Sequence, residues 1–134
     1  MQPLSTELFD LVLVTGATAL MWLPYTVARI ATRGLMRSLG NPDPSAPPDA
    51  AWAERARRAH ANAVENLTVF APLVVIAALV GLATPATLFG ARLYLVARLV
   101  HYFVYVAGIP VIRTLAFVAG WVATLIFAAD LLGV

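Results

Sequence analysis

Long apolar stretches, each able to cross a lipid bilayer, constrain this chain more than any other feature. The 23 residues from Leu8 to Ile30 contain only two charged side chains, Asp10 and Arg29. About 20 apolar residues cross the roughly 30 Å hydrocarbon core of a membrane. Hydrophobic residues fill 61% of the 134 positions and charged residues 12%, whereas about a quarter of a soluble domain is charged. Because a soluble fold of this size could not bury so much apolar surface, we expect lipid around the chain.

Proline and threonine divide the remaining sequence into helices. The segment 40–48 (GNPDPSAPP) contains four prolines and is the one clear linker. Asp49 is the expected N-cap of the helix that follows, and Thr84-Pro85 is expected to open the third helix. Pro24 is expected to bend the first. The predicted fold class is an all-α integral membrane protein: a single domain, 1–134, of four transmembrane helices at about 5–38, 50–82, 85–107 and 110–132.

Arginine supplies all nine basic residues and is concentrated around the first loop, 39–49. The second loop, 81–85, has none, and basic residues are enriched in cytoplasmic loops. The first loop is therefore expected in the cytoplasm, with both termini outside the cell (inner) membrane. Acidic rather than basic residues begin the first apolar stretch, so we expect a retained span and not a secretory signal. Six arginines flank the first loop: Arg29, Arg33, Arg37, Arg55, Arg57 and Arg58.

Composition argues against several classes of site. Without cysteine, disulfides and thiolate metal sites are excluded. His60 and His101 are the only histidines, so no metal centre is expected. The formal net charge is +2, but the arginines flank or interrupt apolar segments instead of forming a solvated basic face. Nucleic acid is therefore not an expected partner.

The second predicted helix has a polar stripe. Arg55, Arg58, Asn62 and Glu65 are spaced i, i+3, i+7 and i+10, which places them within an arc of roughly 80° at about 100° per residue. A charge at mid-bilayer costs roughly 2.5 kcal/mol or more, so such groups are functional candidates. The alternative is an interfacial salt-bridge ladder in which Glu65 neutralises an arginine.

The third predicted helix repeats the pattern with Arg98, His101 and Tyr105 at i, i+3 and i+7. Arg98 has apolar neighbours on both sides and cannot face lipid cheaply, so it is expected to point inward, toward Glu65. A histidine beside tyrosines is more often a hydrogen-bonded core residue than a ligand.

Arg113 and Thr114 begin the fourth predicted helix at the same membrane face. Taken alone, Arg113 is better explained as an anchor whose charge reaches the interface. Taken together with the two stripes, it completes a positively charged pocket with one carboxylate. Guanidinium groups bind carboxylates in bidentate fashion, so the pocket would suit a small zwitterion with more carboxylate than ammonium.

Three segments carry a resemblance to a known family: ERARRAHANAVEN at 54–66, RLVHYFVYVAGIPVIRT at 98–114 and NPDP at 41–44. From about residue 33 to 117 the sequence resembles the MAPEG family, the membrane-associated proteins in eicosanoid and glutathione metabolism, and within it a bacterial microsomal glutathione transferase-like member. The resemblance implies a homotrimer that binds glutathione between subunits near the cytoplasmic face. With Arg98 added because it is expected to point inward, the expected glutathione-binding residues are Arg33, Arg55, Arg58, Asn62, Glu65, Arg98, His101 and Tyr105.

The resemblance also implies catalytic residues. Arg113, which matches the glutathione-contacting pattern, and Thr114 beside it match the region proposed to stabilise the glutathione thiolate. Ala61 stands where the prostaglandin E synthase branch has a further arginine, Thr114 replaces its serine, and Phe117 replaces its tyrosine. These departures weaken a specific eicosanoid assignment and leave the general glutathione site intact.

The hypothesis favoured by the sequence is a membrane glutathione transferase that could also act as a peroxidase, with glutathione as co-substrate and no metal. Its other partners would be a lipophilic electrophile, membrane lipid and further copies of the chain. One alternative is a non-catalytic lipid-binding or scaffold member of the same family. A third hypothesis, a small multidrug exporter of lipophilic cations, is disfavoured because Glu65 lies among arginines.

Overall fold

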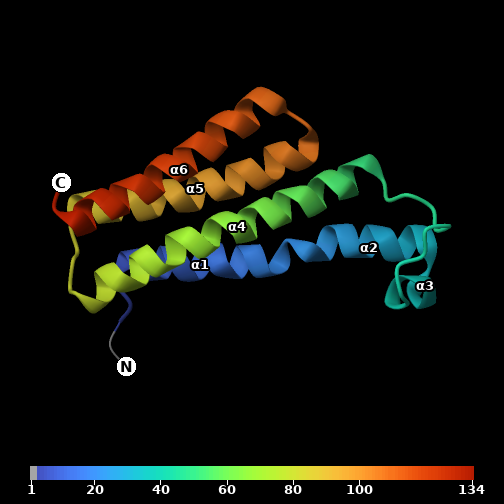
Figure 1. Cartoon of the computed structure of the whole chain (residues 1–134), viewed down its shortest axis with the longest axis horizontal. Coiled ribbons are helices and arrows are strands. Elements are labelled where there is room, and N and C mark those ends of the chain that lie inside the picture. Colours follow the sequence, from blue (N-terminus) through green and yellow to red (C-terminus); the bar gives the residue numbers. More distant parts are fainter. Residues whose placement is uncertain (1–2) are drawn as a thin grey trace.

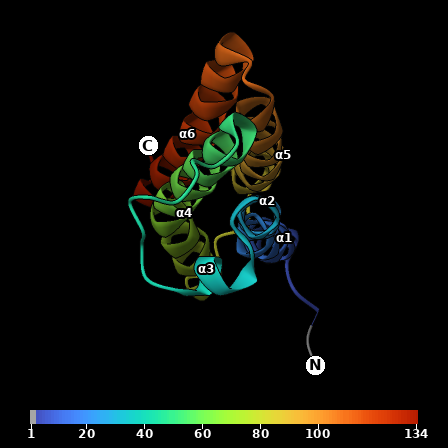
Figure 2. The same cartoon turned by 90° about the vertical axis from the view of Figure 1, so that its right-hand side faces the viewer.

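The computed structural model of the chain describes residues 3–134. Every regular element in that range is helical. Helices α1, α4, α5 and α6 form a bundle, and α2 continues from α1 along α4 (Figures 1 and 2). The helices are α1 (Thr6–Leu20), α2 (Trp22–Arg33), α3 (Leu35–Leu39), α4 (Ala51–Leu79), α5 (Pro85–Ala107) and α6 (Pro110–Leu132).

Three stretches are long and apolar enough to cross a membrane, judged by length and composition: Thr6–Arg33, Ala51–Leu79 and Pro110–Leu132. Helix α5 has the same 23-residue length as α6. It contains Arg92 and Arg98, which lower its hydropathy. Within residues 3–134, three helical stretches are therefore long and apolar enough to cross a membrane, whereas four spans were expected from the sequence.

The first helix, expected over 5–38, is interrupted twice. Met21 separates α1 from α2, three residues before Pro24. Proline has no N–H to donate, and its ring crowds the carbonyl of Leu20 four residues earlier, which explains the position of the break. Gly34 ends α2 with φ of 81°, a conformation that favours glycine. The chain therefore changes direction here and enters the first loop through the short α3.

An aromatic cluster fills the centre of the bundle. The rings of Phe70 and Tyr94 are stacked, with centroids 3.6 Å apart and planes 5° from parallel. Phe127 meets Phe70 edge-on at 5.3 Å, an arrangement that aromatic quadrupoles favour. A Cβ at Gly90 would lie 3.1 Å from the Phe127 ring. Glycine at that position thus allows α5 and α6 to approach closely.

A smaller contact holds the α1–α2 break against the bundle. Met21, Ala59, Ala63 and Tyr102 are buried together. The Tyr102 hydroxyl donates a hydrogen bond of 3.1 Å to the Met21 carbonyl. A buried carbonyl without a partner would cost free energy, so this bond stabilises the interrupted helix.

Thr84 caps α5, as the sequence indicated. Its side-chain oxygen accepts hydrogen bonds from the backbone N–H groups of Ala86 and Thr87. Pro85 follows at the first helical position, where its missing N–H costs nothing. Near the same end of the bundle, the Nε of Arg92 lies 3.0 Å from the buried carboxylate of Asp10, which ties α5 to α1.

Asp49 is not the N-cap of α4; that position belongs to Ala50 and has no side-chain cap. The Asp49 carboxylate instead binds Nη2 of Arg29 at 2.6 Å and Nη2 of Arg33 at 3.0 Å. Hydrogen bonding from Arg29, with the charges of both arginines, holds the pKa of the Asp49 carboxyl below its usual range. The Asp49 side chain, which the sequence pattern assigned to a local cap, therefore forms ion pairs with two arginines at the end of α2.

We expect Phe70→Ala to destabilise the bundle by about 3–5 kcal/mol, because it removes both aromatic contacts and leaves a cavity. The measurement is thermal unfolding of detergent-solubilised protein followed by helical circular dichroism. Phe89→Ala is the matched control, since the Phe89 side chain is exposed on α5. Equal losses in the two variants would contradict the aromatic core.

The Asp49 carboxylate is expected to stabilise the fold by about 1 kcal/mol after discounting for partial exposure. Its lowered pKa fixes the sign: the contribution is complete above the ordinary carboxyl pKa of about 4 and is lost as pH falls through the lowered value. The melting temperatures of the wild type and Asp49→Asn should therefore differ near pH 7, and the difference should narrow as the pH falls below about 4. A constant difference across this range would contradict the assignment.

Candidate functional site

A pocket of about 260 Å³ lies between α4 and the ends of α5 and α6 where those two helices meet. Five of its six lining residues were identified from the sequence; the sixth, Phe117, was noted only as a departure from the family pattern. The α5–α6 turn and the first loop lie toward the same end of the molecule (Figure 1). The lining residues are Asn62, His101, Tyr105, Arg113, Thr114 and Phe117.

A tight turn places Arg113 in this pocket. Gly108 ends α5 in the left-handed conformation with φ of 79°, a common helix C-terminus. Pro110 begins α6 two residues later. The chain therefore reverses at once, and Cζ of Arg113 lies 4.6 Å from the centroid of the Tyr105 ring. This cation–π contact orients the guanidinium group across the pocket.

His101 and Thr114 also line this pocket. His101 is almost fully buried and meets the Tyr105 ring edge-on, with centroids 5.5 Å apart. Thr114 is exposed, and its hydroxyl donates a 3.1 Å hydrogen bond to the carbonyl of Pro110. To donate a hydrogen bond to a ligand, the Thr114 hydroxyl would have to rotate away from this carbonyl.

Arg98 points into the bundle, but its partner is not the one expected. The predicted partner was Glu65, whereas Nη2 of Arg98 donates a 2.6 Å hydrogen bond to Oδ1 of Asn62. Asn62 and Glu65 are three residues apart on α4, which turns Glu65 by about 60° around the helix. Glu65 is exposed there. The bond fixes the orientation of the Asn62 amide, so that its NH₂ group remains available to a ligand.

The environment of Arg98 is unusual for a charge. The residue is 1% exposed, and its Nε and Nη1 have no hydrogen-bond partner among residues 3–134. Its guanidinium carbon lies 5.8 Å from the Phe117 ring centroid. A Cβ at Gly120 would lie 3.1 Å from Cδ of Arg98. The glycine makes room for the side chain, and the aromatic ring covers part of the cation.

Five of the eight predicted glutathione-binding residues do not line this pocket: Arg98, described above, and four others. Nε of Arg55 donates a 2.9 Å hydrogen bond to the carbonyl of Val106, beside the turn that begins α6. Arg33 binds Asp49 at the end of α2, as described above. Within one chain, therefore, the stripe on α4 separates into one pocket residue and several that face elsewhere.

The remaining two predicted residues, Arg58 and Glu65, lie on exposed parts of α4. Nε of Arg58 is 3.1 Å from a carboxylate oxygen of Glu54, and Nη2 of Arg57 is 2.8 Å from the same oxygen. Glu54 therefore has the role that the salt-bridge alternative gave to Glu65. For Glu65 itself the described residues provide no ion pair.

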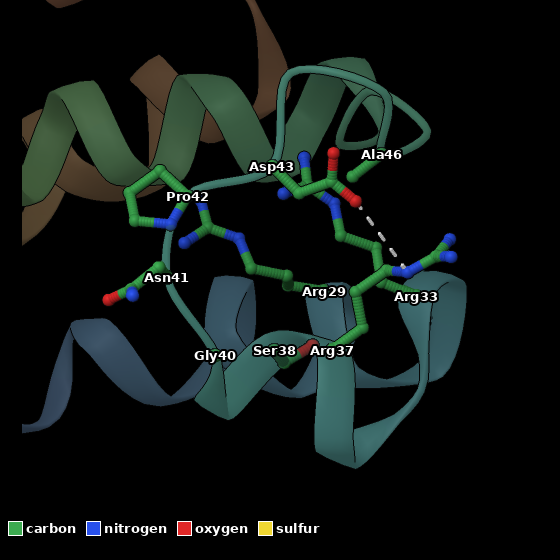
Figure 3. Close-up of a pocket in the computed structure, with 9 residues that line it drawn as sticks. All are labelled: Arg29, Arg33, Arg37, Ser38, Gly40, Asn41, Pro42, Asp43 and Ala46. Carbon is green, nitrogen blue, oxygen red and sulfur yellow. Dashed lines mark ion pairs between the residues drawn. The ribbon is translucent and has the colours of Figure 1, made fainter.

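A second polar pocket, of about 290 Å³, lies between the end of α2, α3 and the first loop (Figure 3). Sequence reasoning assigned only one of its residues, Arg33, to a site. Arg29, Arg33 and Arg37 recur every four residues in the sequence. This spacing does not reveal that the first loop folds back over them.

A sequence model of the MAPEG family matches residues 11–133, nearly the whole chain. The chain belongs to the MAPEG family. Among curated proteins, none matches the sequence. MAPEG membership and the apolar helices indicate a multi-pass membrane protein. At the level of the family they support a glutathione-transferase-like or related membrane function.

We expect Arg98→Met to raise the thermal stability of this MAPEG protein by about 1 kcal/mol or more. Replacing an incompletely partnered buried charge by an apolar side chain of similar length removes a desolvation cost. The measurement is the melting temperature in detergent at neutral pH, with Arg57→Met as the exposed control. A lower melting temperature for Arg98→Met would mean that the guanidinium group gains more from Asn62 and the rings than it loses by burial.

Proposed function

We propose that this MAPEG protein is a membrane glutathione transferase, with peroxidase activity as a second reaction of the same thiolate. The observation that carries the proposal is the position of Arg113, which lies across Tyr105 in a pocket shared with His101 and Asn62. A fixed guanidinium group beside an open, partly apolar pocket suits stabilisation of a thiolate near a lipophilic substrate.

Activation of the thiol is within reach of this arrangement. A free thiol has a pKa near 8.5, and lowering it by about two units takes roughly 2.7 kcal/mol. A single arginine in a site shielded from water can supply that. The thiolate would then attack the electrophilic carbon, forming a sulfur–carbon bond as the leaving group departs with the bonding electrons. Thr114 would support the thiolate after its hydroxyl rotates.

The rest of the peptide would be held by hydrogen bonds and charge. In the proposal, the Asn62 amide, whose oxygen is engaged by Arg98, donates its NH₂ to a glutathione acceptor. His101 and Tyr105 contact the peptide from α5. Carboxylates of glutathione would bind guanidinium groups, and its ammonium would bind Glu65.

The size of the pocket supports assembly from several chains. About 260 Å³ is below the usual 300–1,000 Å³ of small-molecule sites, so one chain would supply part of the site. Arg58 and Glu65 are exposed on α4, where contact with lipid would be costly. We propose a homotrimer of four-span subunits in which this face meets a neighbouring subunit. Arg33 and Arg55 would reach the glutathione from across that contact.

Orientation follows from the same arginines. The first loop lies toward the end of the bundle that also contains the α5–α6 turn (Figure 1), and its flanks carry six arginines. The positive-inside rule supports a cytoplasmic first loop in the cell (inner) membrane, with both termini outside. Cytoplasmic glutathione would then enter from this end, and a lipophilic substrate would enter from the bilayer.

The test is titration of the detergent-solubilised protein with glutathione near neutral pH while the ultraviolet absorbance of the thiolate is recorded. A saturable thiolate signal is expected. Arg113→Ala should reduce thiolate formation by at least about tenfold while glutathione affinity falls less, because the arginine acts on the ionised sulfur. Arg57→Ala, an exposed arginine outside the pocket, is the control.

Equal losses of affinity and thiolate in Arg113→Ala would contradict the catalytic assignment and make Arg113 a simple binding residue. Saturable binding without thiolate in the wild type would favour the non-catalytic lipid-binding member of the family. If glutathione does not bind at all, the pocket takes another ligand and the transferase proposal fails.

A further inference from the structure

The pocket at the first loop carries more positive charge than its own residues neutralise. Arg29 and Arg33 approach it from the end of α2, and Arg37 from α3 (Figure 3). Asp43 is the one carboxylate among its lining residues. The lining residues therefore have a formal charge of +2, in a space of about 290 Å³.

Arg37 is the cation with unused hydrogen-bonding capacity. Its Nε lies 3.9 Å from Oδ2 of Asp43, which is too far for a hydrogen bond. The other oxygen of Asp43 accepts hydrogen bonds from the backbone N–H and the hydroxyl of Ser45, at 2.9 and 2.6 Å. The carboxylate is thus engaged in the loop, and the Arg37 guanidinium remains able to bind another anion.

Asp49 occupies some of the hydrogen-bond donors of Arg29 and Arg33, but it leaves others free. It binds both from outside the lining of the pocket. A guanidinium group has five N–H donors, and Arg33 uses Nη2 for this ion pair. Its buried Nε and the buried hydroxyl of Ser38 have no hydrogen-bond partner among the described residues. Donors therefore surround the pocket in excess of acceptors.

The place of the pocket in the fold indicates which anion meets it. The candidate span Thr6–Arg33 ends at its edge, where a helix leaves the hydrocarbon and reaches the level of the lipid phosphates. Basic pockets at that level bind anionic headgroups. Arginine forks match the geometry of phosphate oxygens. The prolines of the first loop fix its backbone over the arginines.

We propose that this pocket is a binding site for a phosphate group, supplied by an anionic phospholipid headgroup or by free phosphate. It shares no lining residue with the pocket that contains Arg113, although Arg33, which lines it, is also assigned to glutathione in the proposed function. Arg37 and Arg29 bind the phosphate oxygens, and Arg33 and Ser38 support them from the wall. A bound phosphate group would fix the first loop against α2 and hold the subunit at one depth in the membrane.

The test is isothermal titration calorimetry of the full chain in a non-ionic detergent and a phosphate-free buffer. One arm uses dihexanoyl phosphatidylglycerol below its micelle concentration, and the other uses inorganic phosphate. Saturable binding of at least one probe is expected. Binding of the lipid but not of inorganic phosphate assigns the site to a headgroup. Binding of inorganic phosphate but not of the lipid assigns it to the free anion. If each probe displaces the other, the phosphate group alone is recognised.

Three variants locate the binding. Arg37→Gln should raise the Kd of the bound probe by at least about tenfold, as expected for a lost hydrogen bond to a charged group. Asp43→Asn should tighten it, because it removes the only carboxylate in the pocket, and a gain in affinity cannot come from misfolding. Arg57→Gln, a partly exposed arginine on α4 that pairs with Glu54, should leave the Kd within about twofold, the scale of a screened surface charge. Helical circular dichroism checks that each variant is folded.

Binding of neither probe would overturn the proposal. Equal weakening by Arg37→Gln and Arg57→Gln would also do so, because it would indicate general attraction to a basic surface. Displacement of the bound probe by glutathione would show that this pocket belongs to the thiol site. Failure of the glutathione titration leaves this experiment unaffected, since the binding arms require no glutathione.

Discussion

Charge placed inside an apolar bundle has to be enclosed by protein, and Arg98 shows how this constraint shapes the fold. Its guanidinium group is buried between α4, α5 and α6. Gly120 leaves space for it, a Phe117 ring covers it, and Asn62 receives one of its hydrogen bonds. Hydrocarbon offers no driving force for helix association beyond packing and polar contacts. The hydrogen bond between Arg98 on α5 and Asn62 on α4 therefore positions one wall of the pocket that contains Arg113, as well as the two helices.

A second arginine contact has the same effect at the first loop. Asp49, just before α4, binds two arginines at the end of α2. The linker before it is rich in proline and cannot form a helix of its own. The ion pairs therefore decide how the chain returns from α2 to α4, and they leave the arginines of α2 and α3 facing the loop. Both pockets thus depend on one polar contact to arginine: the Asn62 amide to Arg98 in one, and the Asp49 carboxylate to Arg29 and Arg33 in the other.

The sequence predicted the helical architecture and the polar residues, but it did not predict their partners. The inward orientation of Arg98 was predicted correctly, because a charged side chain that faces lipid costs free energy whichever residues surround it. The choice of Asn62 over Glu65 depends on a rotation of about 60° on α4, which periodicity does not resolve when the crossing of two helices is unknown. The role of Asp49 was missed for a related reason: a local cap can be inferred from adjacent residues, whereas ion pairs across a loop require the fold.

For Arg33, the role expected from the family pattern differs from the contact that the side chain makes in the structure. The family pattern assigns it to glutathione, while the structure pairs it with Asp49 on the first-loop side. Both can hold, because one ion pair through Nη2 leaves four of the five guanidinium donors for another contact. Helix α2, which carries Arg33, ends at Gly34, whose positive φ turns the chain away from the helix axis. In the proposed trimer, rotation about the long Arg33 side chain would decide whether its free donors face the loop pocket or the glutathione site of a neighbouring subunit.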